Sequence, residues 1–129
     1  GDRGLGGSAL AAKTLAAIGE IALLRGDRAG ARAEFERAIS LYPQYASLPY
    51  GIGEIYASNG MSEDALAYFE LAARVKPDWP DPWLRLGFVR LKSNDVENAV
   101  RDFRKYLEIA PDISNAGEIG ELIDKLTKK

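Results

Sequence analysis

A proline recurs every 34 residues in this chain, at Pro43, Pro77 and Pro111. Each proline follows a phenylalanine by eight residues, and alanines and glycines recur further upstream in the same register. These recurring residues are Phe35, Phe69, Phe103, Ala31, Ala65, Ala99, Gly19, Gly53 and Gly87. A fixed period without insertions is typical of a repeat array. The sequence therefore predicts three copies of one structural unit.

Each copy contains two segments with the apolar spacing of an amphipathic helix. In the first copy the apolar positions are Leu15, Ile18, Ala22, Phe35, Ala38 and Ile39. Gly26, Gly60 and Asn94 lie between the paired segments, where a chain leaving a helix often becomes left-handed. The residues expected to cap the second helices are Asp27, Ser62 and Asp95. The repeated prolines should stop those helices, because proline cannot continue one.

The small residues of the repeat indicate how the two helices of one copy pack. Antiparallel helices approach closely only where the facing residues are small, and large side chains then fill the flanking gaps. We therefore expect Gly53 and Ala65 to lie where the helices of the second copy meet, with Phe69 beside them.

The pattern resembles the tetratricopeptide repeat, a helix–turn–helix unit of 34 residues. The residues that match it best are Trp83, Leu86, Gly87, Ala99, Phe103 and Pro111. Where the middle copy has the expected Tyr56, the first has Ala22 and the third Arg90. The resemblance implies an all-α fold, a right-handed α–α superhelix of three repeats (12–45, 46–79 and 80–113). A capping helix over 114–128 completes a domain spanning 9–129, and residues 1–8 are expected to be a flexible lead-in or a cloning remnant.

Charge and composition exclude several classes of function. The chain has 17 Lys and Arg against 19 Asp and Glu, so nucleic-acid binding is not expected. It has no cysteine or histidine, which removes the commonest nucleophile, general base and metal ligands. Glu20 and Glu54 could form a carboxylate pair, but an open, wet groove argues against acid–base catalysis, and a third metal ligand is lacking. We expect no catalytic residue, cofactor or metal.

The sequence says less about location. No apolar run approaches the roughly 18–20 residues that cross a bilayer, so we expect no membrane span. The absence of cysteine fits both the cytoplasm and the periplasm, and the compartment stays unknown, with the cytoplasm favoured.

The resemblance also implies a binding surface, the concave groove formed by the first helix of each repeat. The family's usual contact positions suggest a peptide-binding groove made of Lys13, Glu20, Leu24, Tyr50, Glu54, Leu84, Phe88, Leu91 and Lys92. Apolar anchors would supply the affinity, and the two glutamates would select a basic or amide-bearing ligand. The alternative for Leu23, Leu24 and Leu91 is packing between neighbouring helices.

Function follows from this resemblance as an expectation. The chain is expected to be a non-catalytic scaffold that holds a peptide or helix of a partner protein. The alternatives are a self-assembling homo-oligomer and a secretion-type chaperone, although the glycine-rich opening offers little for a chaperone's helical extension. In relatives that bind acidic tails, the clamp positions correspond to Ala16, Glu20, Gly51, Asp81 and Arg85. Since only Arg85 suits a carboxylate, that ligand is not expected.

Overall fold

The computed structural model describes the backbone of residues 2–128 and the side chains of residues 7–128. Helices and their connecting turns make up this range, with no strand in it. The helices are α1 (Asp2–Leu24), α2 (Arg28–Leu41), α3 (Ser47–Ser58), α4 (Ser62–Val75), α5 (Pro80–Lys92), α6 (Val96–Ile109) and α7 (Ala116–Thr127). The predicted all-α fold is therefore confirmed.

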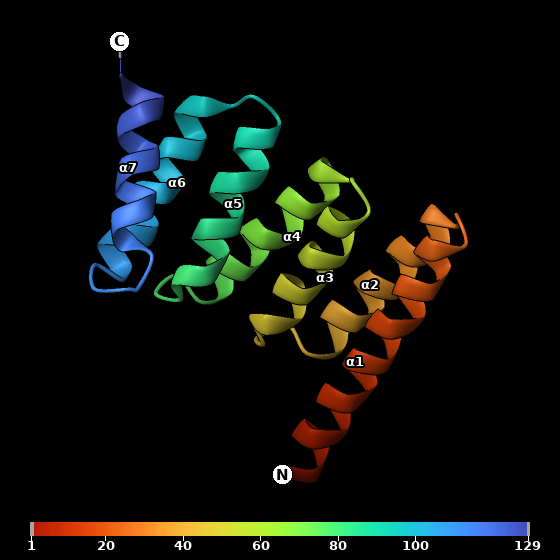
Figure 1. Cartoon of the computed structure of the whole chain (residues 1–129). Helices are drawn as coiled ribbons and strands as arrows, with labels where there is room; N and C mark the ends of the chain where they lie inside the picture. The colour runs from red at the N-terminus through yellow and green to blue at the C-terminus, as the bar shows by residue number, and fades with distance from the viewer. Residues whose placement is uncertain (1, 129) are drawn as a thin grey trace.

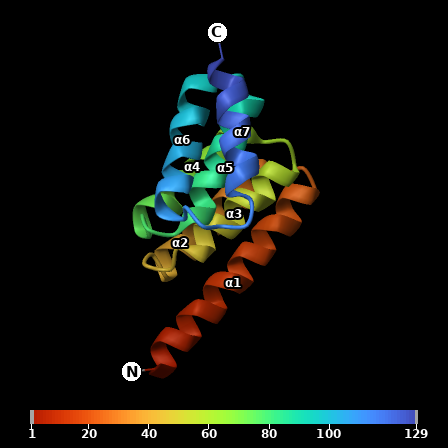
Figure 2. The same cartoon turned by 60° about the vertical axis from the view of Figure 1, so that its left-hand side comes forward.

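The helices form three antiparallel pairs, α1/α2, α3/α4 and α5/α6, which follow one another along a superhelical stack (Figure 1). α7 lies beside α6 at the C-terminal end, as the second view also shows (Figure 2). The second helix of each pair ends two residues before its repeated proline, at Leu41, Val75 and Ile109. Proline thus limits these helices as the sequence predicts.

The turns within the pairs have the predicted conformation. Gly26, Gly60 and Asn94 adopt φ values of 85°, 73° and 64°, in the left-handed region. Asp27 and Asp95 cap the following helices, since their carboxylates accept hydrogen bonds from backbone N–H groups at 2.8 and 3.4 Å. The predicted cap at Ser62 is wrong, because α4 already includes it, Met61 takes the capping position, and no side chain caps that helix.

The repeated phenylalanines join the two helices of each pair. Phe35, Phe69 and Phe103 are at most 1% exposed, and each ring lies against the glycine of the first helix. A Cβ atom added at Gly53 would lie 2.7 Å from the Phe69 ring, too close for any side chain there. The predicted packing of large rings against small residues is confirmed.

A charged cluster between α4, α5 and α6 explains why the third repeat has Arg90 where the family has a tyrosine. The Arg90 guanidinium donates to Asp102 Oδ2 at 2.6 Å and to Glu70 Oε1 at 3.2 Å. Asp102 is 1% exposed, and burial raises the pKa of its carboxyl while the Arg90 hydrogen bond opposes the rise. The third repeat therefore replaces the family's tyrosine with an ion pair that has its own buried partner.

Two hydrophobic clusters make up the core. The first extends from α1 to Leu86 in α5, and the second joins α6 to α7 through Ile119 and Ile123. Trp83 packs against both clusters, and its indole Nε1 donates to the Pro77 carbonyl at 3.1 Å. α7 covers the second cluster, as expected of a capping helix.

The first helix differs from expectation in two ways. The segment expected to be a flexible lead-in is helical from Asp2, because the alanine-rich stretch after it favours propagation of the helix toward the N-terminus. The argument against a secretion-type chaperone, that the glycine-rich opening offers little for a helical extension, therefore does not hold. Gly7–Leu24 is also long and apolar enough, by length and composition, to cross a membrane, contrary to the expectation of no such run. Only Lys13 and Glu20 carry charge within it.

α1 nevertheless packs as the first helix of a repeat. Gly19 faces the Phe35 ring of α2, and Ala12 and Leu23 are buried in the first core cluster. The N-terminal turns project beyond the end of α2 (Figures 1 and 2). The helix therefore buries one side in the stack and leaves the opposite side open.

An aromatic cluster at the first junction gives a pH-dependent prediction. Tyr68 stacks on Tyr56 at 5.7 Å and meets the edge of Phe35 at 6.3 Å. Burial in this cluster raises the pKa of Tyr68 from 10.0 to about 12. The unfolded chain therefore releases this proton first, so stability should fall as the pH rises through this interval, from 10.0 to about 12.

Urea titrations across that pH interval measure the effect. Tyr68→Phe should flatten the decline, whereas Tyr45→Phe, at a tyrosine that is 37% exposed, should leave it as in the parent chain. An equally steep decline in Tyr68→Phe would show that burial of this phenol is not its cause.

Candidate peptide-binding groove

The predicted site residues do not form one continuous surface. They are distributed over α1, α3 and α5, and two separate hollows lie between these helices. Lys13 and Glu20 line the first hollow, between α1 and α3. Glu54, Phe88 and Lys92 line the second, between α3 and α5. The remaining four, which line neither of these two hollows, are Leu24, Tyr50, Leu84 and Leu91.

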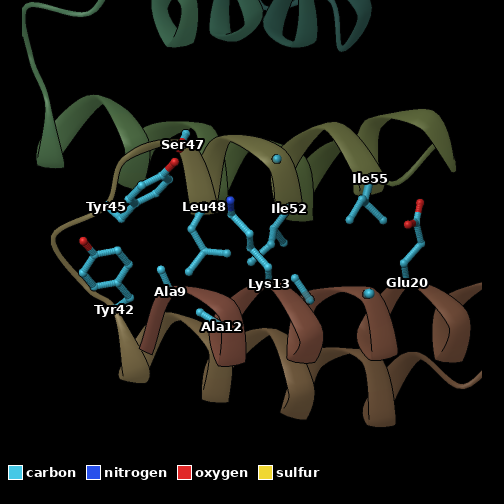
Figure 3. A pocket seen from close by; sticks show the side chains of 13 residues that line it. Ala9, Ala12, Lys13, Glu20, Tyr42, Tyr45, Ser47, Leu48, Ile52 and Ile55 are labelled. Atoms are coloured by element: carbon cyan, nitrogen blue, oxygen red, sulfur yellow. The ribbon is translucent and has the colours of Figure 1, made fainter. Parts of the chain in front are cut away.

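The α1–α3 hollow has a volume of about 290 Å³ and a mostly apolar wall. Small residues on α1 leave the space open, and Leu48, Ile52 and Ile55 of α3 face it (Figure 3). The complete lining is Ala9, Ala12, Lys13, Ala16, Ala17, Glu20, Tyr42, Tyr45, Ser47, Leu48, Gly51, Ile52 and Ile55. Its shape therefore depends on the absence of large side chains on α1.

Polar groups mark the ends of this hollow. Tyr42 and Tyr45 stand together at one end, with ring centroids 5.2 Å apart, and Glu20 stands at the other (Figure 3). Lys13 extends from α1 toward α3 between them. Neither Lys13 nor Glu20 forms an ion pair with another described residue. An apolar floor thus lies between one basic and one acidic group.

The α3–α5 hollow, of about 230 Å³, has an internal ion pair instead. Arg85 donates to Glu54 Oε2 at 3.2 Å and to the Tyr50 hydroxyl at 3.0 Å. The hydrogen bond to Tyr50 raises the pKa of Arg85, and burial raises the pKa of Tyr50. Glu54, expected to select a basic ligand, is therefore already engaged, and so is the one arginine suited to a carboxylate.

The other predicted residues have mixed surroundings. Tyr50 packs on Phe69 and Trp79, with ring centroids 5.6 and 4.8 Å away, and Trp79 is the residue just before α5, so the ring lies next to the junction with the third repeat. Phe88 rests edge-on against Phe103 at 5.0 Å but stays 44% exposed. Leu91 packs partly against the second core cluster, as the packing alternative has it, and Leu84 does so too.

Leu24 lies at the end of α1 and is 69% exposed. Sequence reasoning missed Tyr42, Tyr45 and the apolar α3 residues of the first hollow, Leu48, Ile52 and Ile55. Their signal in the sequence is a pair of tyrosines, one on each side of the Pro43–Gln44 connection between α2 and α3, together with the several alanines of α1. Within the described residues, no cluster of three or more acidic side chains could hold a metal ion.

Comparison with known proteins places this architecture in a family. Models described as tetratricopeptide repeat match residues 16–82 and 52–124, each more than half of the chain. The chain belongs to the tetratricopeptide repeat family. The superhelical stack, the recurring Gly–Phe contact and the glycine or asparagine turns are thus the features of tetratricopeptide repeats in this sequence.

Curated relatives share the repeat over part of their length. A heat-shock protein cognate co-chaperone of Aspergillus fumigatus, sgt12, is 33% identical over 90 residues, covering 64% of this chain and 26% of that protein. The peroxisomal targeting signal receptor of Saccharomyces cerevisiae is 41% identical over 64 residues, covering 48% and 10%. The chain thus spans about a quarter or less of the length of these two relatives.

Solved tetratricopeptide structures have the same fold. The N-terminal domain of stress-induced protein-1 from C. elegans superimposes with a TM-score of 0.74 at 21% identity, covering 94% of this chain and 98% of that domain. The first tetratricopeptide domain of Spaghetti (RPAP3), bound to the HSP90 peptide SRMEEVD, gives 0.70 at 19%, covering 94% and 96%. At these identities the likeness supports the fold.

Proposed function

We propose that the chain is a non-catalytic scaffold that binds a segment of a partner protein in the α1–α3 hollow. The observation that carries the proposal is an open apolar floor between Lys13 and Glu20, two charges without a described partner. Sites of this kind, mostly apolar with a few placed polar groups, suit peptide recognition. The relative bound to an HSP90 peptide and the related co-chaperone support a protein ligand.

The chemistry of the α1–α3 hollow limits the class of peptide that it can bind. Lys13 and Glu20 are seven residues apart on α1, a rise of about 10 Å. A matching segment carries an apolar anchor between an acidic and a basic side chain at a similar spacing. A tail with several acidic residues does not fit, because Lys13 is the one basic residue that lines the hollow, and Arg85, which lines the other hollow, is held by Glu54 and Tyr50. The nine predicted contact residues remain a proposal, with Lys13 and Glu20 as its strongest members.

Filling the hollow tests this function. Gly51 lines it, and a Cβ added there meets nothing within 4 Å, so Gly51→Leu should occupy the space without disturbing the helix pair. Peptides selected from a random 12-residue display library on the parent chain are the probes. Their affinity for Gly51→Leu should fall at least about tenfold, measured by fluorescence anisotropy.

Gly117→Leu is the matched control, because it makes the same change on α7 where the added Cβ also has open space. It should bind the selected peptides as the parent chain does. Equal binding by Gly51→Leu, or failure of the library to yield any specific peptide, would contradict the proposed site.

A further inference from the structure

One position of the repeat is buried in two copies and exposed in the first. Ile52 and Leu86 occupy this position in the second and third repeats and are 0% and 1% exposed. Their counterpart Ile18 is 46% exposed. In the later repeats this side of the first helix packs against the preceding helix pair, as the contact between α4 and α5 illustrates. The same side of α1 has no such neighbour among the described residues.

The open side of α1 is a continuous apolar face. Leu10, Ile21 and Leu24 are 68%, 49% and 69% exposed, and Ala17 lies between them at helical spacing. The Thr14 hydroxyl on this face donates to the Leu10 carbonyl at 2.9 Å, so its hydrogen-bonding need is met within the helix. Exposed apolar surface of this extent, about 20 Å along the helix, marks an interaction site.

The two charges of α1 flank this face on one side. Helical geometry puts Lys13 and Glu20 on the flank that borders the α1–α3 hollow. They lie nearly the same distance from Ala17, one toward each end of the helix. An antiparallel copy of α1 centred on Ala17 would therefore place each lysine opposite a glutamate. It would also place Leu10 opposite Leu24 of the second copy.

We propose that the chain forms a two-fold symmetric dimer through antiparallel pairing of α1 with α1 of a second copy. A two-fold axis perpendicular to both helices keeps the charged flanks on the same side, so two equivalent Lys13–Glu20 pairs form. Ala17, a small residue, lies at the centre, where two helices can approach closely. A parallel pairing would instead place the two charged flanks on opposite sides of the interface, so that neither Lys13 nor Glu20 would meet an opposite charge.

A second copy of the chain fits the apolar face of α1 better than a lipid bilayer does. α1 buries Ala12, Gly19 and Leu23 against its own repeat, so spanning a membrane would require removing the helix from the core. The dimer needs no such change. It places the apolar side chains of the face against those of the second copy, and each Lys13 near a Glu20 of the second copy. It shares Lys13, Ala17 and Glu20 with the hollow, whereas Leu10 and Ile21 do not line the hollow, so a substitution at Ile21 separates dimerisation from peptide binding.

Sedimentation velocity of the full chain tests the dimer. The parent chain should be a dimer at about 100 µM and dissociate on dilution. Ile21→Glu should be monomeric at that concentration, because it buries a charge in the interface. Leu41→Glu is the matched control, since Leu41 is 44% exposed, close to the 49% of Ile21, but lies on α2; it should dimerise like the parent. A monomeric parent chain, or equal dimerisation of Ile21→Glu, would overturn the proposal.

Charge reversal tests the antiparallel arrangement. Lys13→Glu and Glu20→Lys should each weaken dimerisation about tenfold, because each replaces two attractive pairs by two repulsive ones. The double variant Lys13→Glu/Glu20→Lys should recover the parent affinity, and mixing the two single variants should produce a heterodimer. Failure of both rescues would refute the arrangement. So would sedimentation of a monomeric chain with phosphatidylcholine vesicles, which would identify the face as a membrane contact.

Discussion

Phe69→Ala is expected to lower the free energy of unfolding by about 3–5 kcal/mol. The ring is 1% exposed and fills the space over Gly53, and its centroid lies 5.6 Å from that of the Tyr50 ring. Gly53 has no side chain that could move into the cavity, and the helix backbone cannot collapse without disturbing α3. The loss should therefore approach the upper part of this range. Urea denaturation followed by circular dichroism measures it.

Phe88→Ala is the matched control for this prediction. It removes the same side chain from α5, but Phe88 is 44% exposed, so less apolar surface returns to water and no closed cavity forms. The expected loss is about 1 kcal/mol. Similar losses in the two variants would mean that the Gly–Phe contact does not hold the helix pair together.

Asp102→Ala is expected to lower the free energy of unfolding by about 3 kcal/mol. The substitution removes the partner of Arg90, whose side chain is only 15% exposed and cannot readily reach water. Glu70 stays at 3.2 Å from the guanidinium and limits the loss. Chemical denaturation at neutral pH checks this value.

Two further variants separate the buried charge from the ion pair itself. Arg90→Leu/Asp102→Leu should recover most of the stability, because no unpaired charge remains in the interior. Glu108→Ala breaks the exposed pair with Lys105 and should change stability by less than about 1 kcal/mol. If the double variant is no more stable than Asp102→Ala, the loss comes from packing rather than from the isolated guanidinium.

The fold could be predicted from the sequence because each packing contact is repeated three times. The glycine in the first helix, the phenylalanine eight residues before the proline and the turn residues all recur at one period. Asn94 could be identified as left-handed by its place in that period, although it is not a glycine. The start of α1 could not be predicted from the sequence, since glycines near a chain end are equally compatible with an extended or a helical segment.

The candidate site was less accessible to sequence reasoning. Positions carried over from the family identify which face of each helix is concave, but not which neighbours engage one another there. The pairing of Arg85 with Glu54 and Tyr50 depends on the offset between α3 and α5, which no local pattern encodes. The α1–α3 hollow arises from missing side-chain volume at Ala9, Ala16 and Gly51, and a position carried over from the family marks a contact without indicating an empty space.

Both tryptophans of the chain lie where the second repeat meets the third, Trp79 against Tyr50 and Trp83 against the two core clusters. Indole emission is therefore a local reporter of that single junction, whereas the far-ultraviolet signal sums over every helix. Coincident melting curves from the two probes would mean that the array unfolds as one cooperative block. Separate curves would give the order in which its ends come apart.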